Sequence, residues 1–226
     1  MVKTFIFRPI TPFVLSQGFG EDKACIDNST GKVFAKNPYR DSTPCPPNSH
    51  SIYSFMKGHN GLDLSIKRWT AIYAATPGRV AELSTEPEKG LGVGIITDNS
   101  YYCEELGRSV RFHMRYWHNA ANNVIVGDRV MLGDLIAWAD NTGYSSGDHL
   151  HFEIKPVNVL EVDITKCPIR WTNILQNNGY FGAIDPLPYM NKMYVLDAVS
   201  VIKSIRMKLA NIVELLAELI RKGNLK

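Results

Sequence analysis

The sequence lacks the patterns of several common classes of protein. None of its four cysteines, Cys25, Cys45, Cys103 and Cys167, forms a C-x-x-C pair, which argues against a cysteine zinc knuckle. No H-E-x-x-H motif occurs, so a zinc enzyme that takes its general base from that glutamate is excluded. No run reaches the ~18 apolar residues of a spanning helix. We therefore expect no transmembrane segment.

The sequence also shows no export signal, and the part of the chain before the C-terminal tail has no excess of basic residues. Arg8, Pro9 and Pro12 interrupt the apolar residues of the first twenty positions, whereas a signal peptide needs an unbroken run of roughly 7 to 15. We expect either that a leader has been removed or that the protein leaves its cell by lysis or on a virus particle. The net charge is +3, but residues 192–226 hold seven Lys or Arg against three Asp or Glu. The basic excess belongs to this tail, so nucleic acid is not an expected partner.

The remaining composition predicts a globular body with an appendage. With 226 residues, 45% of them hydrophobic, the chain can bury a core in one domain. From residue 58 to residue 156, short apolar segments alternate with Gly, Asp and Asn turns, which favours an all-β body. We assign residues 1–191 to this domain and residues 192–226 to a tail.

Residues 21–50 are polar and rich in proline, and such a loop is long for a compact domain. This favours a functional or inserted segment. Cys25 and Cys45 bracket it, and a disulfide between them suits an oxidising compartment, while two unpaired, buried thiols fit the sequence equally well.

Two segments show the period-2 alternation of half-buried strands. In residues 109–118 the apolar positions alternate with Arg111, His113 and Arg115, so we expect His113 to be exposed. In DHLHFEIK, residues 148–155, one face is apolar and the other holds His149, His151 and Glu153. The apolar face can enter the core only if both histidines point into a groove or into solvent.

The tail has the spacing of a long amphipathic helix. Apolar residues recur at intervals of 3 and 4, which gives the a and d positions of a heptad repeat. They are Val195, Ala198, Ile202, Ile205, Leu209, Ile212, Leu216 and Leu219. Three roles are compatible with it: packing on its own domain, a coiled-coil seam for self-association or a partner, and an interfacial membrane helix. The first two are favoured over the third.

The histidines suggest a metal site. GHNGLDLS places His59 four residues before Asp63. Zinc prefers imidazole nitrogen and carboxylate oxygen, and a catalytic zinc site keeps three protein ligands and one open position. His59, Asp63 and one histidine of the His149/His151 pair would supply such a set.

Four motifs follow one another along the chain in an order typical of one enzyme family. They are GHNGLDLS, RYWHN, VGDRVMLGDLIAWADNTGYSSGDHLHFEIK and AIDPLPYM. Over residues 14–190, apart from the polar insertion, the chain resembles the lysostaphin-type (LytM-like) zinc metalloendopeptidases, which are peptidoglycan hydrolases. The resemblance implies an antiparallel β-sheet core of the duplicated-hybrid-motif kind. It also implies that Zn²⁺ is bound by His59, Asp63 and His151, while His118 and His149 are catalytic histidines that do not bind the metal.

The chain departs from the family pattern at one place, where Asn119 replaces the leucine that commonly follows the histidine at position 118. This change concerns packing more than chemistry. Tyr53 precedes the first ligand as a tyrosine does in similar enzymes, where it can stabilise an oxyanion. The spacing there varies, so an ordinary core or loop tyrosine is the favoured interpretation. Glu153 could orient a ligand histidine, or it could be a solvated strand residue.

We therefore expect a zinc-dependent endopeptidase that hydrolyses peptide crosslinks of bacterial peptidoglycan, at the cell wall or on a virus particle. The alternative is a catalytically silent relative that binds wall or activates another hydrolase. Silent relatives have typically lost zinc ligands, and here every expected ligand type is present. The tail would attach the enzyme to a particle, to a copy of itself or to an anionic wall surface.

Overall fold

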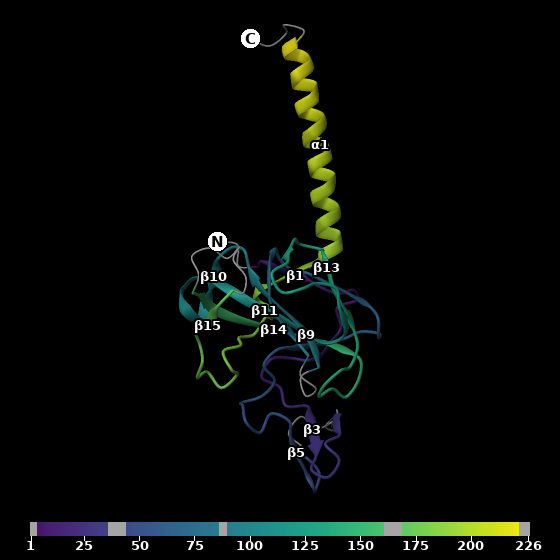
Figure 1. The fold of residues 1–226 in the computed structure, drawn as a ribbon, viewed down its shortest axis with the longest axis vertical. Coiled ribbons are helices and arrows are strands. Elements are labelled where there is room, and N and C mark those ends of the chain that lie inside the picture. The colour runs from purple at the N-terminus through teal and green to yellow at the C-terminus, as the bar shows by residue number, and fades with distance from the viewer. Residues whose placement is uncertain (1–3, 36–43, 86–89, 161–168, 222–226) are drawn as a thin grey trace.

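The computed structural model describes residues 4–35, 44–85, 90–160 and 169–221 (Figure 1). Its strands are β1 (Ile6–Arg8), β2 (Leu15–Gln17), β3 (Ala24–Asp27), β4 (Val33–Ala35), β5 (Ser49–Ser51), β6 (Leu62–Ser65), β7 (Ala71–Tyr73), β8 (Gly78–Ser84), β9 (Leu91–Thr97), β10 (Tyr101–Cys103), β11 (Arg108–Asn122), β12 (Arg129–Val130), β13 (Leu135–Ala139), β14 (His149–Val159), β15 (Trp171–Asn173) and β16 (Met190–Tyr194). The α-helix is α1 (Val195–Arg221), and two 3-10 turns cover Glu104–Leu106 and Leu187–Tyr189.

One large antiparallel sheet forms the body. Its strand order is β12-β8-β9-β11-β14-β6-β2, with β10 and β13 also paired to β11, β7 paired to β13, and β15 paired to β14. The long central strands β11 and β14 pair side by side from Arg111 with Val157 to Trp117 with His151. The mainly β, antiparallel fold class with a C-terminal helix is confirmed.

The core lies on one face of these central strands. Phe112, Met114 and Tyr116 of β11 and Leu150, Phe152 and Ile154 of β14 are fully buried. These residues occupy the apolar positions of the alternation. His149 and His151 consequently point to the other face, as predicted.

The expectation that His113 is exposed is wrong. Its side chain is buried, with its ring 4.7 Å from that of Trp171 and its Nε2 3.5 Å from the Glu82 carboxylate. The second face of the sheet is covered at this end by a small apolar cluster that includes Ile169 and Trp171. A residue distant in sequence supplies the cover, so the alternation of β11 alone could not reveal it.

The polar segment folds into a small sheet of its own, with order β4-β3-β5. Cys25 is fully buried and forms a disulfide with Cys45, so of the two alternatives for these cysteines the bridge is the one present. Cys103 is a free, buried thiol, and Cys167 lies outside the described residues.

Helix α1 begins directly after β16, which pairs in parallel with β1. Only its first turn packs on the body: Val195 and Ala198 are buried, and Val199 lies so close to Gly133 that a Cβ there would come within 2.4 Å of it. From Ser200 to Arg221 every described side chain is exposed, and the helix projects away from the body (Figure 1). The predicted role in which the helix packs along its own domain is therefore wrong beyond the first turn. Among the described residues, no helix has the length and apolarity needed to cross a bilayer.

Candidate metal centre

Two paired strands and the turn before one of them bring the predicted ligands together. Strand β14 pairs with β6 so that His151 lies directly opposite Asp63. His59 belongs to the turn that precedes β6, and its backbone is tied to residues 20 and 21, since Gly20 N–H donates to the His59 carbonyl and His59 N–H donates to the Glu21 carbonyl. Ligands from remote parts of the sequence thus converge because the sheet register fixes two and the turn fixes the third.

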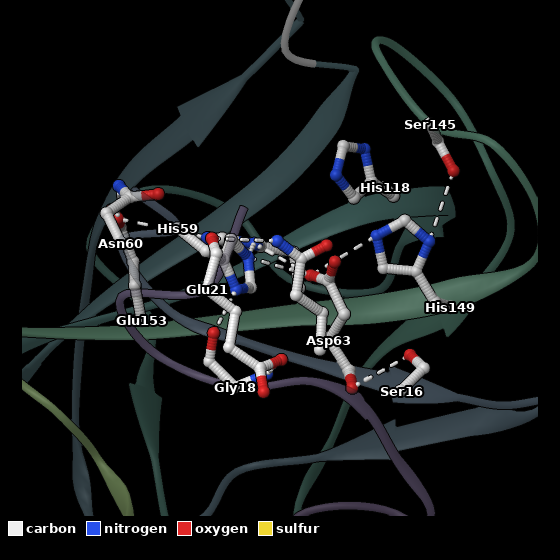
Figure 2. Close-up of polar contacts among 12 residues, drawn as sticks. Ser16, Gly18, Glu21, His59, Asn60, Asp63, His118, Ser145, His149 and Glu153 are labelled. Atoms are coloured by element: carbon white, nitrogen blue, oxygen red, sulfur yellow. Dashed lines mark hydrogen bonds and ion pairs between the residues drawn. The ribbon is translucent and has the colours of Figure 1, made fainter. Parts of the chain in front are cut away.

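The three ligand atoms are almost in contact. His59 Nε2 and His151 Nδ1 are 2.8 Å apart, and each lies 3.0 Å from Asp63 Oδ1. Together they form the one group of His, Cys, Asp or Glu side chains within the described residues that could hold a metal ion. Figure 2 shows His59 and Asp63 turned toward the same point.

The chemistry of this donor set fits zinc. Tetrahedral bonds of ~2.0–2.1 Å hold ligand atoms roughly 3.4 Å apart, so the observed set needs to widen by only a few tenths of an ångström. The orientation of His59 also fits, because its Nδ1–H donates to the Gly18 carbonyl at 3.1 Å and leaves Nε2 as the free donor atom.

The electrostatics of the site favour a bound positive charge. Burial opposes the ionisation of Asp63, but hydrogen bonds from His151 and His59 hold the pKa of this carboxyl well below its usual range. Burial alone would lower the pKa of His151, yet the hydrogen bond with Asp63 and the nearby Glu153 raise it to about 9. A buried carboxylate surrounded by imidazoles attracts either protons or a metal cation.

The other two predicted histidines lie beside this group. The His149 ring is 4.6 Å from that of His118, and the His118 ring is 6.0 Å from that of His151. His149 Nε2 is 3.4 Å from Asp63 Oδ1, farther than either ligand nitrogen. All five residues named from the sequence therefore converge in one place, with His59, Asp63 and His151 innermost.

Hydrogen bonds at Nδ1 fix both outer imidazoles. The Nδ1–H of His149 donates to the Gly147 carbonyl at 2.7 Å, with the Ser145 hydroxyl 3.1 Å away, and that of His118 donates to the Thr142 carbonyl at 2.6 Å. In the neutral ring these bonds leave Nε2 as the basic atom. Burial, with the charges of His149 and His151, lowers the pKa of His118 to about 3, so its ring is neutral near pH 7.

An irregularity in the pairing of β11 sets the backbone conformation of His118. The register with β9 shifts between Trp117 and Asn119, and His118 has a φ of 65°, a left-handed conformation that non-glycine residues rarely adopt. Asn119, where the family commonly has leucine, is fully buried at this break, and its amide donates to the Tyr116 carbonyl and to Asn122. Asn119, the residue that departs from the family pattern, thus stabilises this bulge through its hydrogen bonds.

The cluster lies in a pocket of about 490 Å³. The small sheet forms part of one wall through Ala24 of β3 and Val33 of β4. Phe55 and Phe181, whose rings stack at 5.8 Å, stand exposed at the rim. Tyr144 also lines the pocket.

Glu153 and Tyr53 both contribute to the site. Glu153 is buried, so it is not the solvated strand residue that the sequence allowed; its carboxylate contacts Arg115 at 2.9 Å, Lys155 at 3.2 Å and the Asn60 amide, and lies 3.9 Å from His151 Nε2. Tyr53 is nearly buried in the pocket lining, and its hydroxyl accepts a hydrogen bond from Gln17.

Sequence reasoning missed the groups that orient the imidazoles. Three of them are backbone carbonyls, of Gly18, Thr142 and Gly147, and a carbonyl acceptor leaves no mark in the sequence. Arg115 was placed on the polar face of β11, but its pairing with Glu153 depends on the β11–β14 register.

The antiparallel sheet thus carries two imidazoles and a carboxylate in a pocket, with two more histidines beside them, and the three inner groups could hold a metal ion. Residues 57–163, a little under half of the chain, match the model of Peptidase family M23. The resemblance to lysostaphin-type enzymes is thereby confirmed.

Among curated relatives, the chain is 29% identical over 133 residues to glycyl-glycine endopeptidase ALE-1 of Staphylococcus capitis, covering 58% of this chain and 29% of that protein. It is 29% identical over 166 residues to peptidoglycan DD-endopeptidase ShyA of Vibrio cholerae, covering 70% and 36%. The crystallised catalytic domain of lysostaphin from Staphylococcus simulans aligns with 24% identity and a TM-score of 0.43, covering 59% and 79%. The chain thus spans about a third of the length of these curated relatives.

Proposed function

We propose that this protein is a zinc-dependent endopeptidase that hydrolyses peptide crosslinks in bacterial peptidoglycan. The observation that carries the proposal is the convergence of His59 Nε2, Asp63 Oδ1 and His151 Nδ1 within a pocket. The names of the relatives, which are endopeptidases of glycyl-glycine bonds or of peptidoglycan, support this substrate class.

In the proposed mechanism His59, Asp63 and His151 would hold the ion, and the hydrogen bond from His59 Nδ1–H to the Gly18 carbonyl keeps that ring in place. When bound, zinc supplies a Lewis acid that acidifies water and polarises a carbonyl group. The Glu153 carboxylate, fixed by Arg115 and Lys155, orients the far side of the His151 ring.

His149 and His118 move the protons. Their Nδ1 atoms donate to backbone carbonyls, so a neutral ring presents a basic Nε2. One of them accepts a proton from the attacking water, and a protonated imidazole then donates a proton to the leaving amine. The 4.6 Å between the two rings supports this shared role, because both imidazoles could then reach one scissile bond.

Tyr53 is suited to stabilise the oxyanion of the tetrahedral intermediate. Burial and the charge of Asp63 raise its pKa, so the hydroxyl stays protonated and can donate a hydrogen bond. Its ring lies 5.6 Å from that of His59, and both residues line the pocket.

The alternative, a silent wall-binding or activating relative, is less well supported because the ligand set and both additional histidines are present and converge. The Cys25–Cys45 disulfide supports a site of action outside a reducing cytosol, such as the cell wall. Carriage on a virus particle through the helix would bring the enzyme to the same substrate.

The test is metal analysis of the purified protein together with dye release from purified sacculi, with and without a chelator. We expect stoichiometric zinc and hydrolysis that the chelator abolishes and added zinc restores. His50, exposed in β5, supplies the matched control: His50→Ala keeps zinc and activity, while His151→Ala loses both. Zinc-loaded protein that releases no dye would indicate a silent relative.

A further inference from the structure

The left-handed backbone of His118 depends on support from its surroundings. Its φ of 65° is costly for a residue other than glycine, and such a conformation persists only where neighbouring contacts hold it. The segment that follows β13, residues 140–142, supplies three such contacts. Asp140 N–H donates to the His118 carbonyl at 3.0 Å. The Thr142 hydroxyl donates to the Asn119 carbonyl at 2.8 Å, and the Thr142 carbonyl accepts from His118 Nδ1–H at 2.6 Å. The backbone and the ring of His118 are therefore held by the same segment.

The Thr142 hydroxyl fixes the position of its own carbonyl. Besides its bond to Asn119, it accepts a hydrogen bond from Leu91 N–H at 3.1 Å. Leu91 and Asn119 are paired in β9 and β11 directly after the shift in register. The hydroxyl thus joins Thr142 to both strands beside His118. A carbonyl anchored in this way stays opposite His118 Nδ1, and the hydrogen bond at one ring nitrogen decides which nitrogen of a neutral imidazole carries the proton.

Gly90 packs against the other side of Thr142. It has a φ of 73°, and a Cβ built there would collide with the carbonyl and hydroxyl oxygens of Thr142. Only a residue without a side chain allows this close approach in this conformation. The place of the Thr142 carbonyl is therefore determined by packing as well as by hydrogen bonds.

We propose that Thr142 is a positioning residue that holds the His118 imidazole with its proton on Nδ1 and its Nε2 free for proton transfer. The inference rests on the proposed function, because that function gives His118 a part in moving protons. The hydroxyl of Thr142 bonds to backbone groups of β9 and β11, so it acts on the reaction through His118 and not by contact with the substrate. Its loss should lower kcat and leave KM and zinc content unchanged.

The first test is the replacement of Thr142 by valine, which has nearly the same shape and no hydroxyl. Two hydrogen bonds are lost, and at about fivefold each kcat should decrease by about 25-fold. Thr142→Ser keeps the hydroxyl and should retain most of the natural kcat. A Thr142→Val protein that loses zinc as well would overturn the proposal, since Thr142 would then support the metal ligands and not His118 alone.

Thr97, at the opposite end of β9 from Leu91, supplies a closely matched control. Its hydroxyl donates to the Asn99 carbonyl at 2.8 Å and accepts from Phe112 N–H at 3.1 Å. Thr97→Val therefore removes the same two kinds of bond at another place. We expect it to lower the free energy of unfolding in urea and to leave kcat unchanged. An equal decrease in kcat for the two valine variants would indicate a general loss of stability and would overturn the proposal.

A second pair of variants displaces the Thr142 carbonyl and keeps its hydroxyl. Gly90→Ala places a methyl group against that carbonyl and should lower kcat as Thr142→Val does. Gly107 has a similar φ, 62°, but a Cβ there would meet no atom of the described residues within 4 Å. Gly107→Ala thus introduces comparable backbone strain without the collision, and it should leave kcat unchanged. Equal kcat values for the two alanine variants would contradict the role of the carbonyl.

A measurement without substrate separates this inference from the proposed function. NMR of the full chain labelled with ¹⁵N-histidine shows which nitrogen of His118 carries the proton, and His118→Ala identifies its signals. We expect the proton on Nδ1 in the natural protein and in Thr142→Ser, and a mixture of the two tautomers in Thr142→Val. The Nδ1 tautomer alone in all three proteins would overturn the proposal, whether or not the protein hydrolyses peptidoglycan. The expected tautomers in a protein that hydrolyses no peptide would support the positioning role and refute the proposed function alone.

Discussion

Replacement of His149 separates the role of a proton-transferring histidine from that of a metal ligand. Its Nδ1 is fixed by the Gly147 carbonyl at 2.7 Å, and its Nε2 faces the ligand group without belonging to it, 3.4 Å from Asp63. His149→Ala should therefore retain zinc. It should lower kcat by about 10²- to 10⁴-fold, the usual contribution of a general acid or base. This corresponds to about 2.7–5.4 kcal/mol of activation free energy.

A graded series makes this prediction sharper. Ser145→Ala removes only the weaker contact to the same ring, at 3.1 Å, and the Gly147 carbonyl remains. One lost hydrogen bond of about 1 kcal/mol predicts a decrease of roughly fivefold in kcat. His151→Ala should lose zinc and hydrolysis together.

The assay combines zinc content by mass spectrometry with steady-state hydrolysis of a soluble crosslinked peptide. His50→Ala, in the exposed part of β5, should match the natural protein in both measurements. The reasoning is refuted if His149→Ala empties the metal site while His151→Ala leaves it filled, since the two roles would then be exchanged.

Three further predictions follow from neighbouring groups. Tyr53→Phe should keep zinc and lower kcat by about 10²-fold with little change in KM, which is the loss expected for one oxyanion donor. An unchanged kcat would mean that Tyr53 contributes only to packing. Glu153→Gln should weaken zinc affinity by about 10- to 100-fold in a competition titration with a chelator, and unaltered affinity would remove Glu153 from the orientation of His151. Burial lowers the pKa of His113 well below 6.5, so below that pH the unfolded chain binds a proton that the folded chain does not, and the free energy of unfolding decreases as the pH falls. In metal-free protein His113→Gln should reduce this acid dependence by up to about 1.4 kcal/mol per pH unit, measured by urea unfolding, whereas His50→Gln should not.

The sequence predicted those parts of the site that depend on local spacing. The alternation in DHLHFEIK places His149 and His151 on one face, and the structure has them there because Leu150 and Phe152 fill the core. The heptad spacing likewise predicts α1, whose observed bounds are Val195–Arg221.

Other features depend on contacts between remote segments. The burial of His113 requires the Trp171 ring, and no property of β11 alone indicates it. The left-handed conformation of His118 arises from a shift in the pairing of β11 with β9, which is a property of two strands. The polar segment after Gly20 has the composition of a loop, yet its short strands pair and its cysteines join, so it forms part of the pocket wall.

The metal centre itself is tested most directly by crystallography of zinc-loaded protein with anomalous diffraction at the zinc edge. The account predicts one strong peak between His59 Nε2, His151 Nδ1 and the Asp63 carboxylate, with His149 and His118 outside bonding distance. A peak elsewhere, or none in protein that hydrolyses sacculi, would contradict it.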